Sequence, residues 1–173
     1  MKASARLISY ISFFLVLLLC VAMLLVQYIS LINASQQREA QILYKDFIAQ
    51  IRDKGRTAVN IAATLANQEN VKEAMANKER ERLEQMMLPT WDLLKTQYNV
   101  KQFQFHTAKG ESFKRMHAPD EYGDSLVAFR HTLVAALKNK TPIVGLEKGV
   151  YGVGIRGVVP ILGNTKEVFG SVE

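Results

Sequence analysis

The chain begins with a long apolar stretch that carries no charge. Residues 7–32, LISYISFFLVLLLCVAMLLVQYISLI, contain no Asp, Glu, Lys or Arg. At about 1.5 Å per residue, a helix of this stretch would be roughly 39 Å long, whereas the hydrocarbon core of a bilayer is about 30 Å thick. A cleaved secretory signal has an apolar region of only about 7–15 residues. The pattern therefore predicts an uncleaved transmembrane signal anchor over residues 7–32.

The charges that flank this stretch predict its orientation. Lys2 and Arg6 precede it, and the next positive residue is Arg38. Because positively charged flanks of a span remain in the cytoplasm, residues 1–6 are expected there. The chain after residue 33 is then expected on the opposite, extracytoplasmic side.

A seven-residue repeat follows the predicted span. Residues 34–67 contain no proline. Apolar residues recur at every seventh position, namely at Tyr44, Ile51, Ala58 and Leu65. This pattern predicts one long amphipathic helix that continues from the membrane. Such a helix can pack on its own domain or pair with the same helix of a second subunit, and the pattern leaves both open.

Two shorter helices are predicted next. Asn70 can cap a helix over residues 71–87, which Pro89 would end. Thr90 can cap a third helix over residues 90–98. We expect both helices to flank the part of the chain that follows.

The period of the pattern changes from nearly four to two after Asn99. Residues 100–106, VKQFQFH, and residues 111–117, ESFKRMH, both alternate between apolar and polar positions, as strands with one buried face do. In the second strand the alternation would place Phe113, Arg115 and His117 on one face.

The remaining elements complete a mixed fold. Residues 125–138 have a helical pattern, with Asp124 or Ser125 as the N-cap. Three further strands are predicted over residues 141–147, 150–161 and 166–173, with glycines between them. Short connections between consecutive strands favour antiparallel pairing. The predicted fold class is therefore α+β, with an N-terminal transmembrane helix continuing into a long helix, and then an antiparallel sheet with flanking helices.

The composition of the chain argues against several kinds of binding partner and of chemistry. The net charge of +6 is spread along the chain among acidic residues, without the basic block or interleaved aromatic residues typical of nucleic-acid binding. Cys20 is the one cysteine and lies within the predicted span. We therefore expect no nucleic-acid partner, no disulfide and no thiolate metal cluster.

Motifs for catalysis and cofactors are also missing or out of context. Residues 152–157, GVGIRG, match the dinucleotide fingerprint in letters, but the strand-like run Val158-Val159-Pro160 follows where that motif requires a helix. The histidines lack zinc-site spacing, and no G-x-S-x-G elbow occurs. We expect no catalytic residue, no metal and no cofactor. An exported enzyme that uses His117 with Asp124 remains the least favoured alternative.

Cationic residues instead indicate recognition of an anion. Arg115 and His117 would project from one strand, Arg130 lies early on the following helix, and Arg156 lies beside strand glycines. Converging cations can bind a carboxylate through charge-assisted hydrogen bonds, and a glycine in a strand often marks a close approach. Alternatively, the arginines pair with nearby acids and only hold the loop. The candidate ligand-binding residues are Arg115, His117, Tyr122, Asp124, Arg130, Glu147 and Arg156.

Residues 100–173 resemble a known sensor region. The matching motifs are SF-x-R-x-H-x-P-x-x-YGD-x-L from Ser112, P-x-x-G-x-E-x-G from Pro142, and G-x-G-x-RG-x-x-P from Gly152, with GSVE at the end. In this order they resemble the extracytoplasmic region of bacterial methyl-accepting chemotaxis proteins and sensor kinases with a double Cache domain. Lys114 departs from that pattern, which has an apolar residue there.

The resemblance implies a PAS-like sheet in a dimeric receptor of the bacterial inner membrane, with its sensor part in the periplasm. It implies a ligand-sensing chemoreceptor region, not an enzyme, that binds a small carboxylate or amino acid. It further implies a second module, a return span and a cytoplasmic signalling region beyond Glu173, through which cytoplasmic partners act. The same sensor on a histidine kinase or cyclic-dinucleotide enzyme is the alternative. The expected divisions are residues 1–6 in the cytoplasm, 7–32 in the membrane, 33–98 as helical stalk and helices, and 99–173 as sensor sheet.

Overall fold

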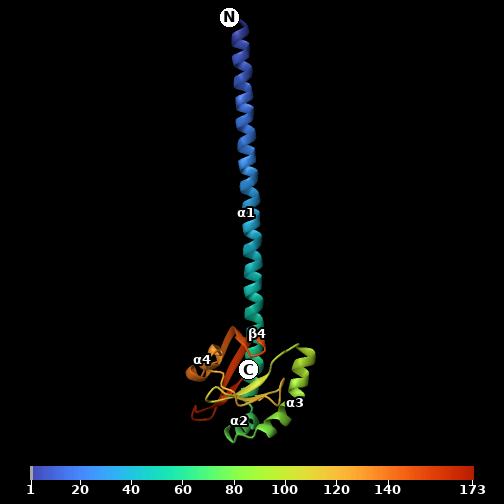
Figure 1. Ribbon diagram of the computed structural model, residues 1–173, viewed down its shortest axis with the longest axis vertical. Coiled ribbons are helices and arrows are strands. Elements are labelled where there is room, and N and C mark those ends of the chain that lie inside the picture. Colours follow the sequence, from blue (N-terminus) through green and yellow to red (C-terminus); the bar gives the residue numbers. More distant parts are fainter. Residues whose placement is uncertain (1) are drawn as a thin grey trace. The chain divides into compact units, whose positions relative to one another are not determined.

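The computed structural model describes residues 2–173, and it describes side chains from residue 10 onward. The chain divides into two compact units, one ending at Ala49 and one running from Gln50 to Glu173. Helix α1 (Lys2–Ala66) has no break where the units meet. The predicted continuation of the apolar helix into a long helix is therefore confirmed (Figure 1).

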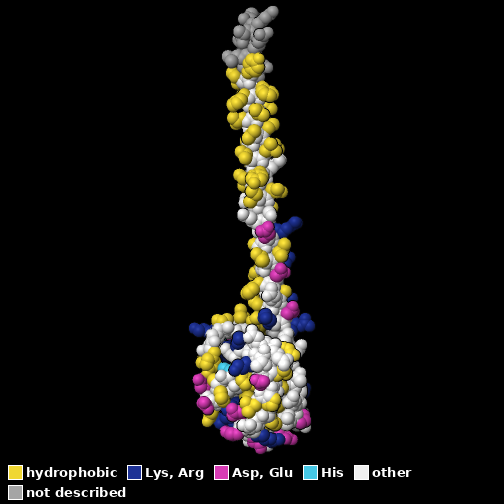
Figure 2. Space-filling view, turned by 90° about the vertical axis from the view of Figure 1, so that its right-hand side faces the viewer, with side chains coloured by type: hydrophobic (Ala, Val, Ile, Leu, Met, Phe, Trp, Pro, Cys, Tyr) yellow, Lys and Arg dark blue, Asp and Glu magenta, His cyan; other side chains and the backbone are white. Residues whose placement is uncertain are grey.

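The first unit consists of the N-terminal part of α1. Its described side chains up to residue 33 are exposed and uncharged, and Figure 2 shows apolar side chains covering this part of the helix. Among the described helices, α1 is the one long and apolar enough to cross a membrane. An exposed apolar surface of this extent is typical of a segment that contacts lipid or a partner.

The heptad pattern of α1 has different roles along the helix. Leu65 is buried in the main core of the second unit, together with Ala62. Tyr44, in the first unit, remains exposed. The C-terminal end of the repeat therefore packs on its own domain, as one of the two sequence interpretations expected.

Helix α2 (Glu69–Ala76) is shorter than the predicted helix over residues 71–87. That prediction is wrong because Lys78 adopts a left-handed backbone conformation, with φ of 58°, which an α-helix does not accommodate. The N-cap position is occupied by Gln68, not by Asn70. The Asn70 side chain instead accepts a hydrogen bond from the neighbouring Val71 N–H at 2.9 Å.

Helix α3 (Arg80–Gln97) contains Pro89 in its interior. The predicted helix end before Pro89, and the predicted start at Thr90, are therefore wrong. A proline inside a helix removes one backbone hydrogen bond. Leu83, Met87 and Leu94 nevertheless form one buried face on both sides of the proline. Burial of that face offsets the lost hydrogen bond, and the helix continues.

A five-stranded antiparallel sheet with the order β2-β1-β5-β4-β3 forms the rest of the second unit. Its strands are β1 (Gln104–Thr107), β2 (Ser112–Arg115), β3 (Ile143–Gly149), β4 (Gly152–Leu162) and β5 (Val168–Val172), and helix α4 (His131–Asn139) lies between β2 and β3 in the chain. The predicted α+β class with an antiparallel sheet is confirmed. The first two strands are shorter than the predicted ones.

Helix α4 begins later than the predicted helix over residues 125–138. The segment before it pairs with the chain around β2: the Asp124 carbonyl accepts from the Ser112 N–H at 2.9 Å, and the Leu126 N–H donates to the Gly110 carbonyl at 3.0 Å. Backbone groups engaged in this pairing are not available to a helix. The predicted cap at Asp124 or Ser125 is therefore wrong, and Arg130 precedes the helix.

The sheet has a core on each face. The larger core, toward α1, α2 and α3, includes Phe103, Phe105, Val159, Ile161 and Val172. The smaller core, toward α4, consists of Leu126, Leu133, Ala136 and Val158. The neighbours Val158 and Val159 lie in opposite cores, as the alternation of side chains along a strand requires.

A β-bulge in β2 changes which of its side chains share a face. Ser112 lies opposite His106 and Lys114 lies opposite Phe105, so Phe113 is the extra residue. A bulge locally disrupts the alternation and redirects side chains.

Two successive residues at the bulge consequently contact α3. The Arg80 guanidinium lies 5.1 Å from the centre of the Phe113 ring, and Lys114 forms an ion pair with Glu84 at 2.5 Å. Arg115 instead bonds to the loop that follows β2. The prediction that Phe113 and Arg115 share a face is therefore wrong. The pair with Glu84 explains how a charged residue is accommodated at position 114.

Candidate functional site

The α4 side of the sheet carries a cluster of buried polar residues. Arg130, directly before α4, and Arg156 on β4 are only 2% and 3% exposed. Ion pairs and hydrogen bonds join them to acids and to strand residues. We call the following residues the polar cluster: His106, Arg130, Glu147, Arg156, Ser171 and Glu173.

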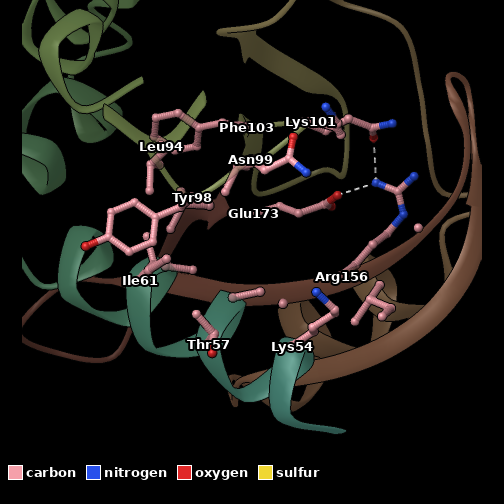
Figure 3. A pocket seen from close by; sticks show the side chains of 18 of the residues that line it. Lys54, Thr57, Ile61, Leu94, Tyr98, Asn99, Lys101, Phe103, Arg156 and Glu173 are labelled. Atoms are coloured by element: carbon pink, nitrogen blue, oxygen red, sulfur yellow. Dashed lines mark hydrogen bonds and ion pairs between the residues drawn. The ribbon is translucent and has the colours of Figure 1, made fainter. Parts of the chain in front are cut away.

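Glu173 is the centre of the cluster's ion pairs. One of its carboxylate oxygens accepts a hydrogen bond from Arg156, and the other accepts one from Arg130. Arg156 also donates to the Gln102 side-chain oxygen at 2.9 Å, and Figure 3 shows both bonds of Arg156. Two guanidinium groups from different elements thus share one buried carboxylate.

These charges keep Glu173 ionised. Burial by itself raises the pKa of the Glu173 carboxyl, but His106, Arg130 and Arg156 lower it by more, so the pKa lies below its usual value. The pKa of His106 is about 4, so this ring is uncharged at neutral pH and the two arginines lower the Glu173 pKa there. The carboxylate consequently remains charged in the buried site.

His106 is fully buried in the cluster. Burial lowers its pKa from 6.5 to about 4, against the opposing effect of Glu173 and with the help of the three nearby arginines. Its Nδ1 lies 3.0 Å from the Ser171 hydroxyl, across the β1–β5 pair. At neutral pH the ring is therefore neutral and offers one donor and one acceptor nitrogen.

Arg130 also faces Glu147 on β3. The Arg130 Nε and the nearer Glu147 oxygen are 3.8 Å apart, which is within ion-pair range but too long for a hydrogen bond. The other Glu147 oxygen accepts hydrogen bonds from the backbone N–H and hydroxyl of Thr132 at the start of α4. Glu147 thus ties the first turn of α4 to the sheet.

Arg115 holds the loop beside the cluster. It donates to Asp124 at 2.7 Å and to the Glu121 carbonyl at 2.9 Å. The hydrogen bond from Arg115 lowers the pKa of Asp124 below its usual value. The sequence interpretation in which arginines pair with nearby acids therefore describes the contacts of Arg115, and partly those of Arg130.

His117 and Tyr151 lie in contact with each other beside Arg115. Their rings meet edge to face with centres 5.0 Å apart, and the Arg115 guanidinium lies 6.0 Å from the centre of the Tyr151 ring. Burial lowers the pKa of His117. The Tyr151 ring thus lies close to both His117 and Arg115.

Several buried polar atoms in and near the cluster have no hydrogen-bond partner within the described residues. They are His106 Nε2, Ser112 Oγ, His117 Nε2, Arg130 Nε, Glu147 Oε2, and Nε and Nη2 of Arg156. Leaving one such group unpaired costs about 1–3 kcal/mol. Three of these atoms are guanidinium donors, whereas Glu147 supplies a carboxylate acceptor. The arrangement is chemically suited to a small polar molecule that offers mainly acceptor oxygens.

The structure thus separates the predicted site residues. Arg130, Glu147 and Arg156 lie in the cluster, Arg115 and His117 lie near it, and Asp124 is held by Arg115. Tyr122 lies outside the cluster, where it is half exposed and stacks under Arg80 at 3.9 Å.

Sequence reasoning missed His106, Ser171 and Glu173 as cluster residues. Alternation along each predicted strand gives the face of a residue within its own strand only. The opposition of His106 and Ser171 follows from the register between β1 and β5, which the pattern does not contain.

Comparisons with known proteins assign the chain to a family. A model of the double Cache type, the double sensory domain of two-component sensor kinase, matches residues 33–173. The chain belongs to this family. The double Cache resemblance found in the motifs of the sheet is thereby confirmed, and the match extends into the helices before it.

One solved structure agrees with the fold of this double Cache chain, and a second is a weaker match. The crystal structure of the Escherichia coli DcuS sensor domain matches with a TM-score of 0.56 and 17% identity, over 71% of this chain and 88% of that one. A domain of a putative sensory box/GGDEF family protein from Vibrio parahaemolyticus matches with a TM-score of 0.43 and 16% identity, over 74% and 57%. No curated protein sequence matches the chain significantly. At this identity the DcuS likeness shows the fold alone.

Proposed function

We propose that this double Cache chain is the extracytoplasmic ligand-sensing region of an inner-membrane receptor, and that a small carboxylate or amino acid binds at the polar cluster. The observation that carries the proposal is the set of buried polar atoms that have no hydrogen-bond partner among the described residues, which includes atoms of Arg130, Glu147 and Arg156. A ligand carboxylate would accept from the guanidinium donors. Glu147 could in turn accept from a ligand ammonium group.

Binding at this position could be passed on through the sheet. Glu173 directly follows β5 and Arg156 lies on β4, and the next residue on β4, Gly157, lies against the backbone of α1. A ligand that prefers one arrangement of Arg156 would therefore favour one packing of β4 on α1. The response is limited by the difference in affinity between the two arrangements.

The proposed receptor is a homodimer that responds through a chemotaxis output. Exposed apolar residues on α1 after the span, including Leu43, Tyr44 and Phe47, support pairing with a second copy. The family description, which names sensor kinases, supports the alternative of a histidine kinase output. A kinase or cyclase domain encoded downstream of Glu173 would contradict the chemotaxis assignment.

Ligand-induced thermal stabilisation tests the binding proposal. The full chain in lipid nanodiscs is heated with a panel of small mono- and dicarboxylates and amino acids. A ligand at about 100 times its Kd adds roughly 2.7 kcal/mol of stability, so a binder should raise Tm by several degrees. If no member of the panel raises Tm, the proposal fails.

A matched pair of variants then assigns the site. Arg156→Lys keeps the charge but loses the planar fork, and it should weaken binding of the identified compound at least tenfold. Arg82→Lys changes an arginine on α3 that pairs with Glu73 on α2 and with Glu79 directly before α3, away from the cluster, and should leave binding unchanged. Equal affinity in wild type and Arg156→Lys would place the ligand elsewhere.

A further inference from the structure

A hollow of about 660 Å³ lies at the end of the sheet where β4 begins (Figure 3). Its walls come from the C-terminal part of α1, the end of α3 with the loop after it, and the first residues of β4. Apolar side chains line much of it, including Ile61, Leu65, Leu94, Phe103 and Ile155. Its volume is that of a site for a small organic molecule.

Cationic side chains gather on one side of this hollow. Figure 3 shows Lys54 and Arg156 on the side away from Leu94 and Tyr98. Lys101 also lines the hollow. Among the residues that the structure describes, the side-chain ammonium groups of Lys54 and Lys101 form no ion pair or hydrogen bond.

Arg156 extends this positive region into the protein. Its Nε and Nη2 are buried without partners in the described part of the chain. The acids that line the hollow are Asp53 and Glu173, and Glu173 is already neutralised by Arg130 and Arg156. The charge at this end of the hollow therefore favours an anion.

We propose that the hollow is a second binding site, for a small organic anion with an apolar body, such as an aryl-substituted or medium-chain monocarboxylate. The apolar body would lie against Leu65, Leu94 and Phe103, with its carboxylate toward Lys54, Lys101 and Arg156. The polar cluster takes a compact polar ligand instead, because its unpaired atoms lie between charged side chains. Arg156 and Glu173 belong to both sites, so binding at one should change the affinity of the other by the same factor in both directions.

Trp91 provides a reporter for this site. It is the one tryptophan of the chain, and its ring centre lies 6.3 Å from that of Phe103, which lines the hollow. The full chain in nanodiscs is titrated with 4-phenylbutyrate while Trp91 emission is recorded. A saturable change in emission is expected, and the neutral 4-phenylbutyramide should bind at least fivefold more weakly.

Variants of α1 separate this site from the polar cluster. Thr57 lines the hollow and is exposed, and its hydroxyl bonds back to the Asp53 carbonyl within the helix. Thr57→Phe should fill the hollow and weaken 4-phenylbutyrate binding at least tenfold. The panel compound identified by thermal shift should still stabilise this variant. A failure confined to 4-phenylbutyrate would thus leave the proposed function in place.

The double variant Lys54→Gln/Lys101→Gln removes two positive charges from the hollow. It provides a second test in case Thr57→Phe does not fold. It should weaken 4-phenylbutyrate at least fivefold, whereas Arg52→Gln, on α1 but not lining the hollow, should not. No saturable change in wild type, equal binding of the amide, or unchanged binding in these hollow variants would overturn the proposal. A change of oligomeric state in Thr57→Phe would also overturn it, because a second copy would then cover the hollow.

Discussion

At the scale of single residues, the polar cluster depends on how Glu173 is shared. Arg130 and Arg156 both donate to this carboxylate, and both are buried. A buried ion network adds little net stability over an apolar core of similar volume, because its charges lose their hydration. Unpaired donors on the same arginines make the arrangement less favourable still. We interpret this cost as support for the proposal that these charged side chains bind a ligand.

His106 makes the folded protein sensitive to acid. Its pKa is about 4 in the folded state, compared with about 6.5 in an unfolded chain. The unfolded state therefore binds the proton first, and the free energy of unfolding should fall as the pH drops from 6.5 to 4, by up to roughly 3 kcal/mol. Above pH 6.5 this histidine should not change the free energy of unfolding with pH. Urea unfolding at several pH values measures the slope.

A neutral variant isolates this contribution. His106→Asn keeps a polar group near Ser171 and should flatten the slope between pH 6.5 and 4. His117, whose pKa is also lowered, accounts for part of what remains. The lowered pKa of Glu173 also contributes to the free energy of unfolding. This contribution is present above the unfolded pKa of 4.5, and it is lost only as the pH falls below that value. An identical slope in wild type and His106→Asn would contradict the assignment.

At the scale of elements, the glycines of β4 determine how closely α1 and the sheet approach. A Cβ on Gly157 would lie 2.5 Å from the Val59 backbone nitrogen and 2.7 Å from the Ala58 carbonyl carbon. A Cβ on Gly154 would meet only Arg156, at 4.0 Å. The motif that resembled a dinucleotide fingerprint thus contains a helix-packing glycine.

These two glycines form a matched test of that packing. Gly157→Ala should destabilise the protein by about 1–3 kcal/mol, because two backbone segments must move apart. Gly154→Ala should change stability by less than about 0.5 kcal/mol. Chemical denaturation followed by circular dichroism measures both. If the two variants lose stability equally, the close contact of β4 with α1 is not what Gly157 provides.

At the scale of the whole molecule, the exposed apolar part of α1 requires an environment other than water. The side chains of residues 10–33 are exposed and uncharged, and the second unit has its own core. A bilayer would remove this apolar surface from water without help from the folded unit. We therefore propose a span over residues 7–32, with the sheet outside the cytoplasm.

Cysteine labelling tests this topology. Cys20 is the one cysteine of the chain, so a Cys20→Ala background is free of thiols. In intact spheroplasts a membrane-impermeant maleimide should label Lys138→Cys, at an exposed position on α4, but not Lys2→Cys. Lysis should make Lys2→Cys reactive. The reverse pattern would contradict the proposed orientation.

The sequence by itself determined the features that depend on local patterns. An uncharged apolar run indicates a possible span whatever follows it, and the change of period after Asn99 marks the start of the sheet region. Several motifs in a fixed order were enough to indicate the double Cache family. Arg130 and Arg156 could be chosen as candidates because cationic side chains that converge from different elements can bind a carboxylate.

Only the tertiary structure decided the features that depend on contacts distant in sequence. Packing on the sheet carries α3 through Pro89, and a bulge opposite Phe105 separates Phe113 from Arg115. Glu173 becomes the partner of Arg130 and Arg156 because β5 lies between β1 and β4. Periodicity specifies the face of a residue within its own element, whereas strand register and ion-pair partners are set by how the elements meet.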